Sequence, residues 1–377
     1  NVFIFDQTKI PFEQVVVSLA TALDFERCIK TMQVRGAPLI GVTAAYGMFV
    51  AGREIASQVD ESGDWQQDFG ARFRVSGDRL KATRPTAVNL AWAVDRQIRL
   101  AEETLQSNSA ATPRDVAASL LRQADAICED DVKMCNLIGE AGSRLLSHIW
   151  ERISEHRQAT LPKVKGKHPY PNHLNVLTHC NAGLLACVTM GTATGPIYTS
   201  NAKGIPVHVW VRETRPRLQG ARLTAWELSK AGIPHTVVAD NAGGWLMRQG
   251  WVDAVIVGAD RVAKNGDVCN KIGTYSLALS ARDNAVPFFV AFPSSTVDMH
   301  IASGDDIPIE FRSEDEVTNV EGPIVAGSTI GTDQKVVTVR AIDPSSSALN
   351  PAFDVTPSRL VTALITERGV CQAGEEG

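Results

Sequence analysis

The amino-acid sequence predicts an α/β protein with a mainly helical N-terminal domain, residues 1–157, followed by a doubly wound parallel-sheet domain, residues 158–377. Three observations support this prediction. The length of 377 residues exceeds what one ordinary core accommodates. The first 150 or so residues carry apolar side chains mainly at helical spacing. From residue 174 onwards, short apolar runs alternate with helix-length segments, which is typical of a parallel sheet with right-handed crossovers.

The N-terminal domain is expected to open with a short strand at 2–5. Helices are then expected, in chain order, at 12–23, 24–32, 36–52, 87–108 and 114–156. The uncharged run 36–52 has 17 residues and four glycines, which is too short and too mildly apolar for a membrane span, so it predicts a buried helix. Residues 55–80 are polar and less clearly patterned, and we expect a surface excursion there.

The C-terminal domain begins after a stretch rich in Pro, Lys and His, 158–172, which we interpret as a linker or its edge. Strands are predicted at 174–177, 206–211, 235–239, 253–257, 286–292 and 336–340. Helices are predicted at 184–202, 219–231, 273–283 and 357–368. In such open α/β sheets, ligands bind at the carboxyl ends of the strands, so the turns after the strands are where a site is expected.

Composition excludes several classes of function. The net charge of −5 gives no support to a nucleic-acid partner or a membrane partner. The seven cysteines are an odd number without a CxxC pair, which indicates reduced thiols in a cytoplasmic protein and neither a disulfide framework nor a metal site. No GxGxxG follows a strand, and Walker A, HExxH and GxSxG motifs are absent from the sequence, so the predicted fold does not by itself imply a nucleotide.

Two turns at strand ends carry candidate catalytic groups. Cys180 follows the strand 174–177 and precedes a predicted helix, where backbone N–H groups and the helix dipole stabilise a thiolate. Asp260 follows the apolar strand 254–257, and desolvation there would raise its pKa and suit it to proton transfer. The alternatives are a buried structural thiol and a turn-capping carboxylate paired with Arg261. We interpret Cys180 and Asp260 as two halves of one catalytic site.

Basic side chains beside helix starts are candidates for binding a small anion. Arg35 and Gly36 precede a helix that begins at Pro38, and Arg84 stands beside another proline. Lys271 lies close to a predicted helix start, where a cation is unfavourable unless an anion offsets it. The alternative is a set of surface charges without a ligand, and this applies equally to the basic loop 212–220.

Six ordered segments of the sequence are familiar. They are VRGAP at 34–38, TRPTAVNL at 83–90, THCNAG at 178–183, RETRPRLQGARLTAWEL at 212–228, GADRVAKNGDVCNKIGTY at 258–275 and PIEFR at 308–312. Together they resemble the methylthioribose-1-phosphate isomerase family, whose fold is shared with regulatory subunits of a translation-initiation guanine-nucleotide exchange factor. The resemblance extends over about residues 2–368.

The resemblance implies a Rossmann-like C-terminal domain, a homodimer, and isomerisation of an aldose 1-phosphate to the ketose 1-phosphate without a cofactor or metal. The implied substrate is the sugar phosphate 5-methylthioribose 1-phosphate, an intermediate of methionine salvage. Carried over by motif, Cys180 and Asp260 are the catalytic pair. The residues that would hold the substrate are Arg35, Gly36, Ala37, Arg84, Gln219, Asn270 and Lys271.

The sequence also departs from the family pattern, in LLACVTM after THCNAG, in DNAGGWL at 240–246 and at Cys269. These departures leave the 5-substituent of the sugar open, so 5-deoxyribose 1-phosphate or both sugars are alternatives. Ribose 1,5-bisphosphate is a third alternative within the same class. Outside that class, the alternative is a non-catalytic regulatory subunit of a translation-initiation exchange factor. The presence of both Cys180 and Asp260 argues against it, because a pure binding module has no use for that pair.

Overall fold

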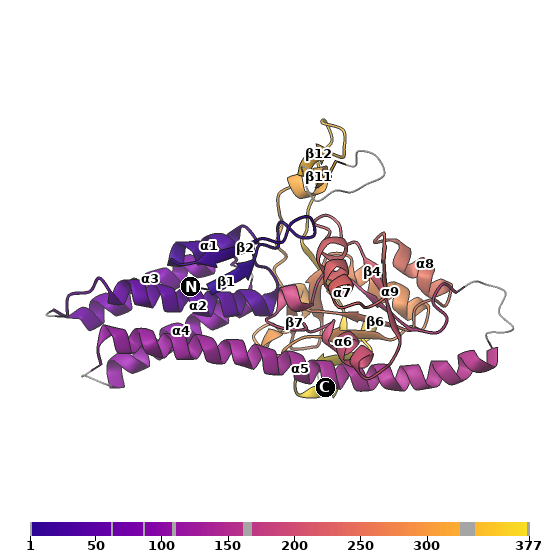
Figure 1. Cartoon of the computed structure of the whole chain (residues 1–377), viewed down its shortest axis with the longest axis horizontal. Helices are drawn as coiled ribbons and strands as arrows, with labels where there is room; N and C mark the ends of the chain where they lie inside the picture. The colour runs from indigo at the N-terminus through magenta and orange to yellow at the C-terminus, as the bar shows by residue number, and fades with distance from the viewer. Residues whose placement is uncertain are drawn as a thin grey trace.

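A helical N-terminal part lies beside a sheet-containing C-terminal part, and one long helix runs along both (Figure 1). The structure is a computed structural model that describes residues 2–61, 63–85, 87–107, 111–160, 168–324 and 336–374. The N-terminal part opens with an antiparallel pair, β1 (Val2–Phe5) and β2 (Val16–Leu19). Its helices are α1 (Ala22–Lys30), α2 (Ala37–Ala56), α3 (Trp65–Ala82), α4 (Val88–Ser107) and α5 (Pro113–Thr160).

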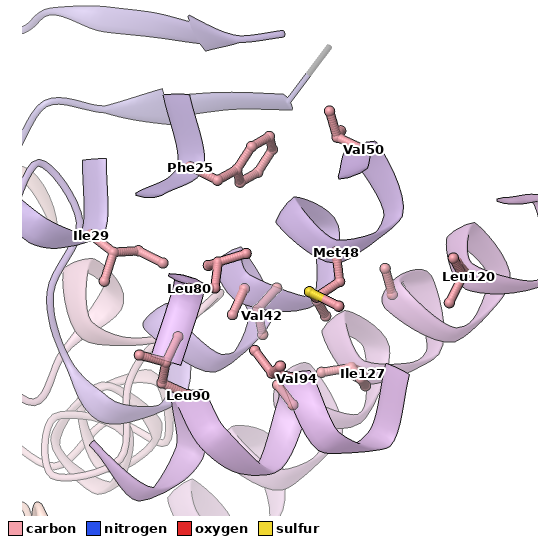
Figure 2. Close-up of a cluster of buried hydrophobic side chains, with 14 of the residues drawn as sticks. Phe25, Ile29, Val42, Met48, Val50, Leu80, Leu90, Val94, Leu120 and Ile127 are labelled. Atoms are coloured by element: carbon pink, nitrogen blue, oxygen red, sulfur yellow. The ribbon is translucent and has the colours of Figure 1, made fainter. Parts of the chain in front are cut away.

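Helix α2 is the centre of the N-terminal core. Figure 2 shows Val42 and Met48 of α2 among side chains contributed by the surrounding helices, such as Phe25, Val94 and Leu120. Each fully buried side chain of this size contributes about 1.5–3 kcal/mol to folding. Helix α2 extends to Ala56 and, by length and composition alone, is long and apolar enough to cross a membrane, which corrects the expectation that this run is too short and too mildly apolar. However, 67% of its most apolar window is buried inside the protein. The prediction of a buried helix at 36–52 is therefore confirmed.

Two expectations for the N-terminal part are wrong. The segment 55–80 is mostly helix α3, because Phe69, Phe73 and Leu80 form a sparse buried stripe on an otherwise polar helix. The segment 12–23 contains strand β2, whose residues pair with β1, and helix α1 begins only at Ala22.

The main sheet has the strand order β15-β14-β9-β6-β3-β4-β5. Its strands are β3 (Leu174–Thr178), β4 (Val207–Arg212), β5 (His235–Val238), β6 (Ala254–Val257), β9 (Phe288–Ala291), β14 (Ala363–Thr366) and β15 (Gly369–Cys371). Neighbouring strands are parallel except for the edge strand β15, which is antiparallel to β14. The chain winds outward from β3 through β4 to β5, then returns to β6 and winds the other way. The switch point of the sheet lies between β3 and β6.

Helices cover both faces of this sheet, which confirms the doubly wound fold. One face packs against α5, α6 (Gly195–Ala202) and α7 (Ala225–Lys230), as shown by Ile138, Ile197 and Leu228 in one apolar cluster with the strands. The other face packs against α8 (Ala242–Arg248) and α9 (Thr274–Asp283). Both faces of the strands are therefore apolar, as the short uninterrupted apolar runs predicted.

Shorter elements surround the carboxyl ends of the sheet. A second sheet has the order β10-β7-β8-β13 and is made of β7 (Arg261–Ala263), β8 (Val268–Lys271), β10 (Val297–Asp298) and β13 (Phe353–Thr356). A hairpin of β11 (Asn319–Pro323) and β12 (Val336–Arg340) follows the short helix α10 (Asp315–Thr318) and projects from the body of the protein (Figure 1). Single turns of 3-10 helix lie at Leu184–Ala186, Ser294–Thr296, Gly304–Asp306 and Ser358–Leu360, and a π-helical turn at Gly220–Thr224 precedes α7.

Three predictions for the C-terminal part need correction. The predicted helix 357–368 is instead a 3-10 turn followed by strand β14, which pairs with β9. The predicted strand 336–340 exists, but it belongs to the projecting hairpin. The predicted helix 184–202 is only a 3-10 turn at its start, and regular helix begins at Gly195.

The boundary between the two parts stays a prediction. Helix α5 contacts α2 in the N-terminal part and α6 and β14 in the C-terminal part, so it is shared by both. Of the predicted linker 158–172, residues 161–167 lie outside the described residues.

Candidate active site

One pocket lies at the carboxyl ends of β3 and β6, the switch point of the main sheet. All of the site residues expected from the sequence line it. They are Cys180, Asp260, Arg35, Gly36, Ala37, Arg84, Gln219, Asn270 and Lys271. The pocket therefore combines a thiol, a carboxyl group and basic side chains contributed by both parts of the chain.

Cys180 follows β3 in the left-handed region of the backbone, with φ of 65°. Its N–H donates to the hydroxyl of Thr214 at 2.9 Å, and its carbonyl accepts from the hydroxyl of Thr224 at 2.7 Å. Because no regular helix begins directly after this turn, the expected stabilisation of a thiolate by a helix dipole is wrong. Burial raises the pKa of the Cys180 thiol, and the positive charges of Arg35 and Lys271 act against that rise.

Asp260 follows β6, and its N–H donates to the carbonyl of Cys269 at 2.9 Å. Burial raises the pKa of the Asp260 carboxyl group, in the direction expected for a carboxylate after an apolar strand, while Lys271 and Arg35 lower it. The alternative of an ion pair with Arg261 finds no support, because Arg261 pairs with Asp298 at 3.5 Å.

Lys271, like Arg35, is a cation that acts on both candidate catalytic groups. It is buried at the end of β8, and its ammonium group lies 4.1 Å from the ring centroid of Phe353. Burial lowers the pKa of Lys271, whereas the charges of Cys180 and Asp260 raise it. Lys271 therefore couples electrostatically to both sides of the pocket.

Arg35 reaches the pocket from the segment before α2. Its guanidinium donates to the side-chain oxygen and to the backbone carbonyl of Asn181, the latter at 2.7 Å. Gly36 follows with φ of 100°, and a Cβ there would lie 2.5 Å from the Cα of Ala186. The first turn of α2 thus packs directly against the segment after Cys180, which explains the need for glycine.

Two polar atoms of the pocket have no partner among the described residues. The Nε of Arg84 and the side-chain oxygen of Gln219 are buried without a hydrogen bond in that part of the protein. Arg84 is also 3.5 Å from Glu310 through another guanidinium nitrogen. A buried donor and a buried acceptor in one pocket are suited to the phosphate oxygens and hydroxyl groups of a sugar phosphate.

Glu227 supports the pocket from behind and was missed by the sequence reasoning. Its carboxylate accepts from the side-chain N–H of Asn181 at 2.9 Å and from the backbone N–H groups of Leu184 at 2.8 Å and Leu185 at 2.9 Å. A Cβ at Gly183 would overlap this carboxylate. Because Asn181 also holds Arg35, Glu227 orients a pocket cation through one intermediate side chain.

Arg312 was also missed, although it ends the PIEFR segment. It lines the pocket, and its guanidinium lies 2.7 Å from Glu316. The available signal was the position of Arg312 in one of the six segments that carry the family resemblance.

The arginines of the basic loop 212–220 bind other segments of the protein and do not line the pocket, whereas Gln219 of the same loop does. Arg212 is buried and donates to the carbonyl of Gly273 at 2.8 Å. Arg215 donates to the carbonyl of Val317 at 2.7 Å, and Arg217 pairs with Glu316 at 2.9 Å. These arginines hold neighbouring segments together.

His179, the residue before Cys180, has its ring hydrogen-bonded within the protein and is not assigned a catalytic role. Its Nε2 is 2.8 Å from the carbonyl oxygen of Ile272, and burial lowers the pKa of its ring to about 3. The imidazole is therefore neutral and held in place.

Comparison with known proteins identifies the family of this chain. A family model described as the initiation factor 2 subunit family matches residues 33–373. The chain is 49% identical to a protein of Methylorubrum populi named methylthioribose-1-phosphate isomerase, over 100% of this chain and 92% of that protein. The chain belongs to the methylthioribose-1-phosphate isomerase family. A protein of the same name from Desulfosudis oleivorans is also 49% identical, with the same coverage, and confirms the resemblance found in the sequence.

Two solved structures share the fold of this chain. The 5-methylthioribose 1-phosphate isomerase of Pyrococcus horikoshii is 36% identical with a TM-score of 0.78, covering 99% of this chain and 91% of that chain. The A. fulgidus protein described as subunit delta of the translation initiation factor eIF-2B is 34% identical with a TM-score of 0.74, covering 99% and 94%. A protein described as the isomerase and a protein described as an initiation-factor subunit therefore both have structures similar to this one.

Proposed function

We propose that this protein is an aldose–ketose isomerase that converts 5-methylthioribose 1-phosphate into 5-methylthioribulose 1-phosphate, an intramolecular oxidoreductase of methionine salvage. One observation carries the proposal. In a chain that is 49% identical over its full length to a protein with this name, Cys180 and Asp260 line the same cationic pocket. The hydrogen moves within the substrate, so the reaction as written calls for no cofactor.

The phosphate group is bound by the basic side chains of the pocket. Arg35, Arg84 and Lys271 come from three separate segments and all line it. A phosphate dianion offsets the positive charge of the buried Lys271, and the unpaired Nε of Arg84 is a donor for a phosphate oxygen. Binding energy from the phosphate is then available to hold the sugar in its reactive open form.

Ring opening is the first chemical step. The anomeric oxygen carries the phosphate, so the sugar does not open through a free hemiacetal, and the ring C–O bond breaks with the phosphate still attached. Asp260 donates a proton to the departing ring oxygen or relays one at O2. Burial raises the pKa of its carboxyl group, which keeps a proton available for this role.

Hydrogen transfer from C2 to C1 is the second step. By one route, Cys180 removes the C2 proton and an enediol-type intermediate forms. By the other route, Cys180 stabilises the transition state of a hydride shift. Turnover in deuterated water separates the routes, because solvent deuterium at C1 marks proton transfer and its absence marks a hydride shift.

The substrate is tested with a panel that covers the alternatives. The panel contains the 1-phosphates of methylthioribose, 5-deoxyribose and ribose, together with ribose 1,5-bisphosphate, and kcat/KM is measured for each. We expect the highest kcat/KM with methylthioribose 1-phosphate. A higher value with the 5-deoxy sugar or with the bisphosphate would replace the substrate and keep the reaction class.

The out-of-class candidate is a non-catalytic regulatory subunit of a translation-initiation exchange factor, and the 34% identity to the A. fulgidus protein is its support. Cys180 and Asp260 in one pocket favour the enzyme, because a binding subunit has no use for the pair. Absence of turnover on every sugar of the panel would favour the regulatory subunit instead.

We further propose that the protein acts in the cytoplasm as a homodimer, without nucleic acid or membrane partners. The family resemblance supports the dimer, and the net charge of −5 supports the absence of polyanionic partners. Sedimentation equilibrium measures the mass in solution. A mass of one chain at assay concentration would contradict the dimer.

A further inference from the structure

Three potential metal ligands meet behind the wall of the pocket. Asp131 and Cys135 are one turn apart on helix α5, so their side chains share a face of that helix. Cys187 approaches them from the segment after Cys180. The carboxylate oxygen and the two sulfur atoms lie within 4.8 Å of one another, and all three residues are buried. Among the residues that the structure describes, no other group of three such side chains is this close.

The surroundings of this cluster favour a bound cation. No lysine or arginine forms an ion pair with Asp131 in the described part of the chain, and the residue is only 2% exposed. A buried carboxylate without a counter-charge is costly, and a metal ion is a common way of balancing it. Asp131 already accepts from the N–H of Val188 at 2.8 Å, which fixes its orientation as an outer hydrogen bond does for a metal-binding carboxylate.

We propose that Asp131, Cys135 and Cys187 bind a zinc-type divalent cation. Two sulfur ligands and one carboxylate oxygen form a donor set that suits zinc. A tetrahedral zinc site holds such atoms roughly 3.5–3.8 Å apart, so side-chain movements of about 1 Å complete the site. Three protein ligands leave a fourth position for water, and Cys187 also lines the pocket, which provides an access route from solvent.

Binding has defined chemical consequences. Both cysteine thiols lose their protons to solvent when their sulfur atoms coordinate the metal, so binding weakens as the pH falls. The metal ties helix α5 to the segment that carries Ala186, which packs against Gly36 at the pocket wall. No CxxC spacing marks this site in the sequence, so no metal site was expected there. The fold brings Cys187 to Asp131 and Cys135, which stand more than fifty positions earlier in the chain.

Cadmium titration of the purified full-length chain tests the proposal. The chain is first treated with a chelator and a phosphine reductant, and Cd²⁺ binding is followed by the ultraviolet thiolate-to-cadmium absorption. Asp131→Asn, Cys135→Ser and Cys187→Ser are compared with wild type. The controls are Cys28→Ser, in the N-terminal core, and Cys180→Ser, in the pocket. Metal-free thermal unfolding identifies the variants that fold.

We expect one equivalent of Cd²⁺ per chain in wild type and in both controls, displaced by Zn²⁺, with an increase in Tm when metal is added. Each variant of the cluster should bind at least about tenfold more weakly. Three results would each overturn the site. They are Cd²⁺ binding by Cys135→Ser and Asp131→Asn as tight as that of wild type, loss of binding only in Cys180→Ser, and absence of stoichiometric binding by wild type. In those cases the cluster is a hydrogen-bonded thiol pair beside a carboxyl group and nothing more.

Discussion

Glu227→Gln tests how the pocket is held in shape. The Glu227 carboxylate faces N–H donors on both oxygens, because Oε1 accepts from Asn181 and Leu185 and Oε2 accepts from Leu184. An amide has one acceptor oxygen, so whichever way it turns, its N–H group meets at least one of these donors. A hydrogen bond to a charged group contributes about 1.5–3 kcal/mol, and a buried unsatisfied donor costs about 1–3 kcal/mol. We therefore expect the free energy of unfolding to fall by roughly 2–4 kcal/mol.

The same substitution has a functional consequence that a general loss of stability does not have. Asn181 is oriented by Glu227 and in turn accepts from Arg35, so loosening Asn181 displaces a cation from the phosphate position. We expect KM for the sugar phosphate to rise more than kcat falls, at a temperature where the variant is folded.

Urea unfolding and steady-state kinetics measure the two effects of Glu227→Gln. The matched control is Glu140→Gln, which removes an exposed pair with Lys203 at 2.7 Å and should change stability by no more than about 0.5 kcal/mol. If Glu227→Gln matched Glu140→Gln in both stability and KM, the reasoning about this support would be refuted.

Three further predictions concern the pocket wall, the phosphate site and acid stability. Gly36→Ala should lower the free energy of unfolding by about 2–5 kcal/mol, because the added Cβ would overlap Ala186 and the backbone has a positive φ. The control is Gly322→Ala, whose added Cβ has open space and should leave stability nearly unchanged. Equal urea midpoints for the two variants would contradict this prediction. Arg35→Met should raise KM roughly tenfold or more, because charged hydrogen bonds are lost, and a KM within twofold of wild type would argue against phosphate binding there. Burial lowers the pKa of His208 from 6.5 to about 3, so the unfolded chain takes up a proton first, and stability present above pH 6.5 is lost as the pH falls toward 3. The fall in the free energy of unfolding between pH 6.5 and pH 3, measured by urea unfolding, should be smaller in His208→Asn than in wild type. Identical pH profiles of stability for the two proteins would contradict the role given to His208.

The alternation of strands and helices was predictable because the strands of the main sheet are short apolar runs between polar turns. The run that became β14 was misread as a helix, since its apolar residues fit either period. Pairing of Ala363, Leu364 and Ile365 with β9 decides the outcome, and a single sequence does not contain that contact. The segment from Leu184 was misread for a related reason. The N–H groups of Leu184 and Leu185 are bound by the side chain of Glu227.

The candidate site was more predictable than these elements. Cys180 and Asp260 each follow a strand of a parallel sheet, and topology places the carboxyl ends of such strands at one edge. Glu227 and Arg312 were not predictable in the same way. Their roles depend on contacts with segments far away in the chain, with Leu184 for Glu227 and with the pocket for Arg312.

The central claim is that one thiol and one carboxyl group act on the same bound sugar phosphate. Its most direct test is kcat/KM for 5-methylthioribose 1-phosphate in Cys180→Ser and Asp260→Asn, each checked for a wild-type thermal unfolding curve. Loss of a positioned proton-transfer group lowers the rate about 10²–10⁴-fold, so we expect kcat/KM of each variant to fall by at least about 10²-fold. A folded variant that retained kcat/KM within tenfold of wild type would contradict the role assigned to the residue it replaces.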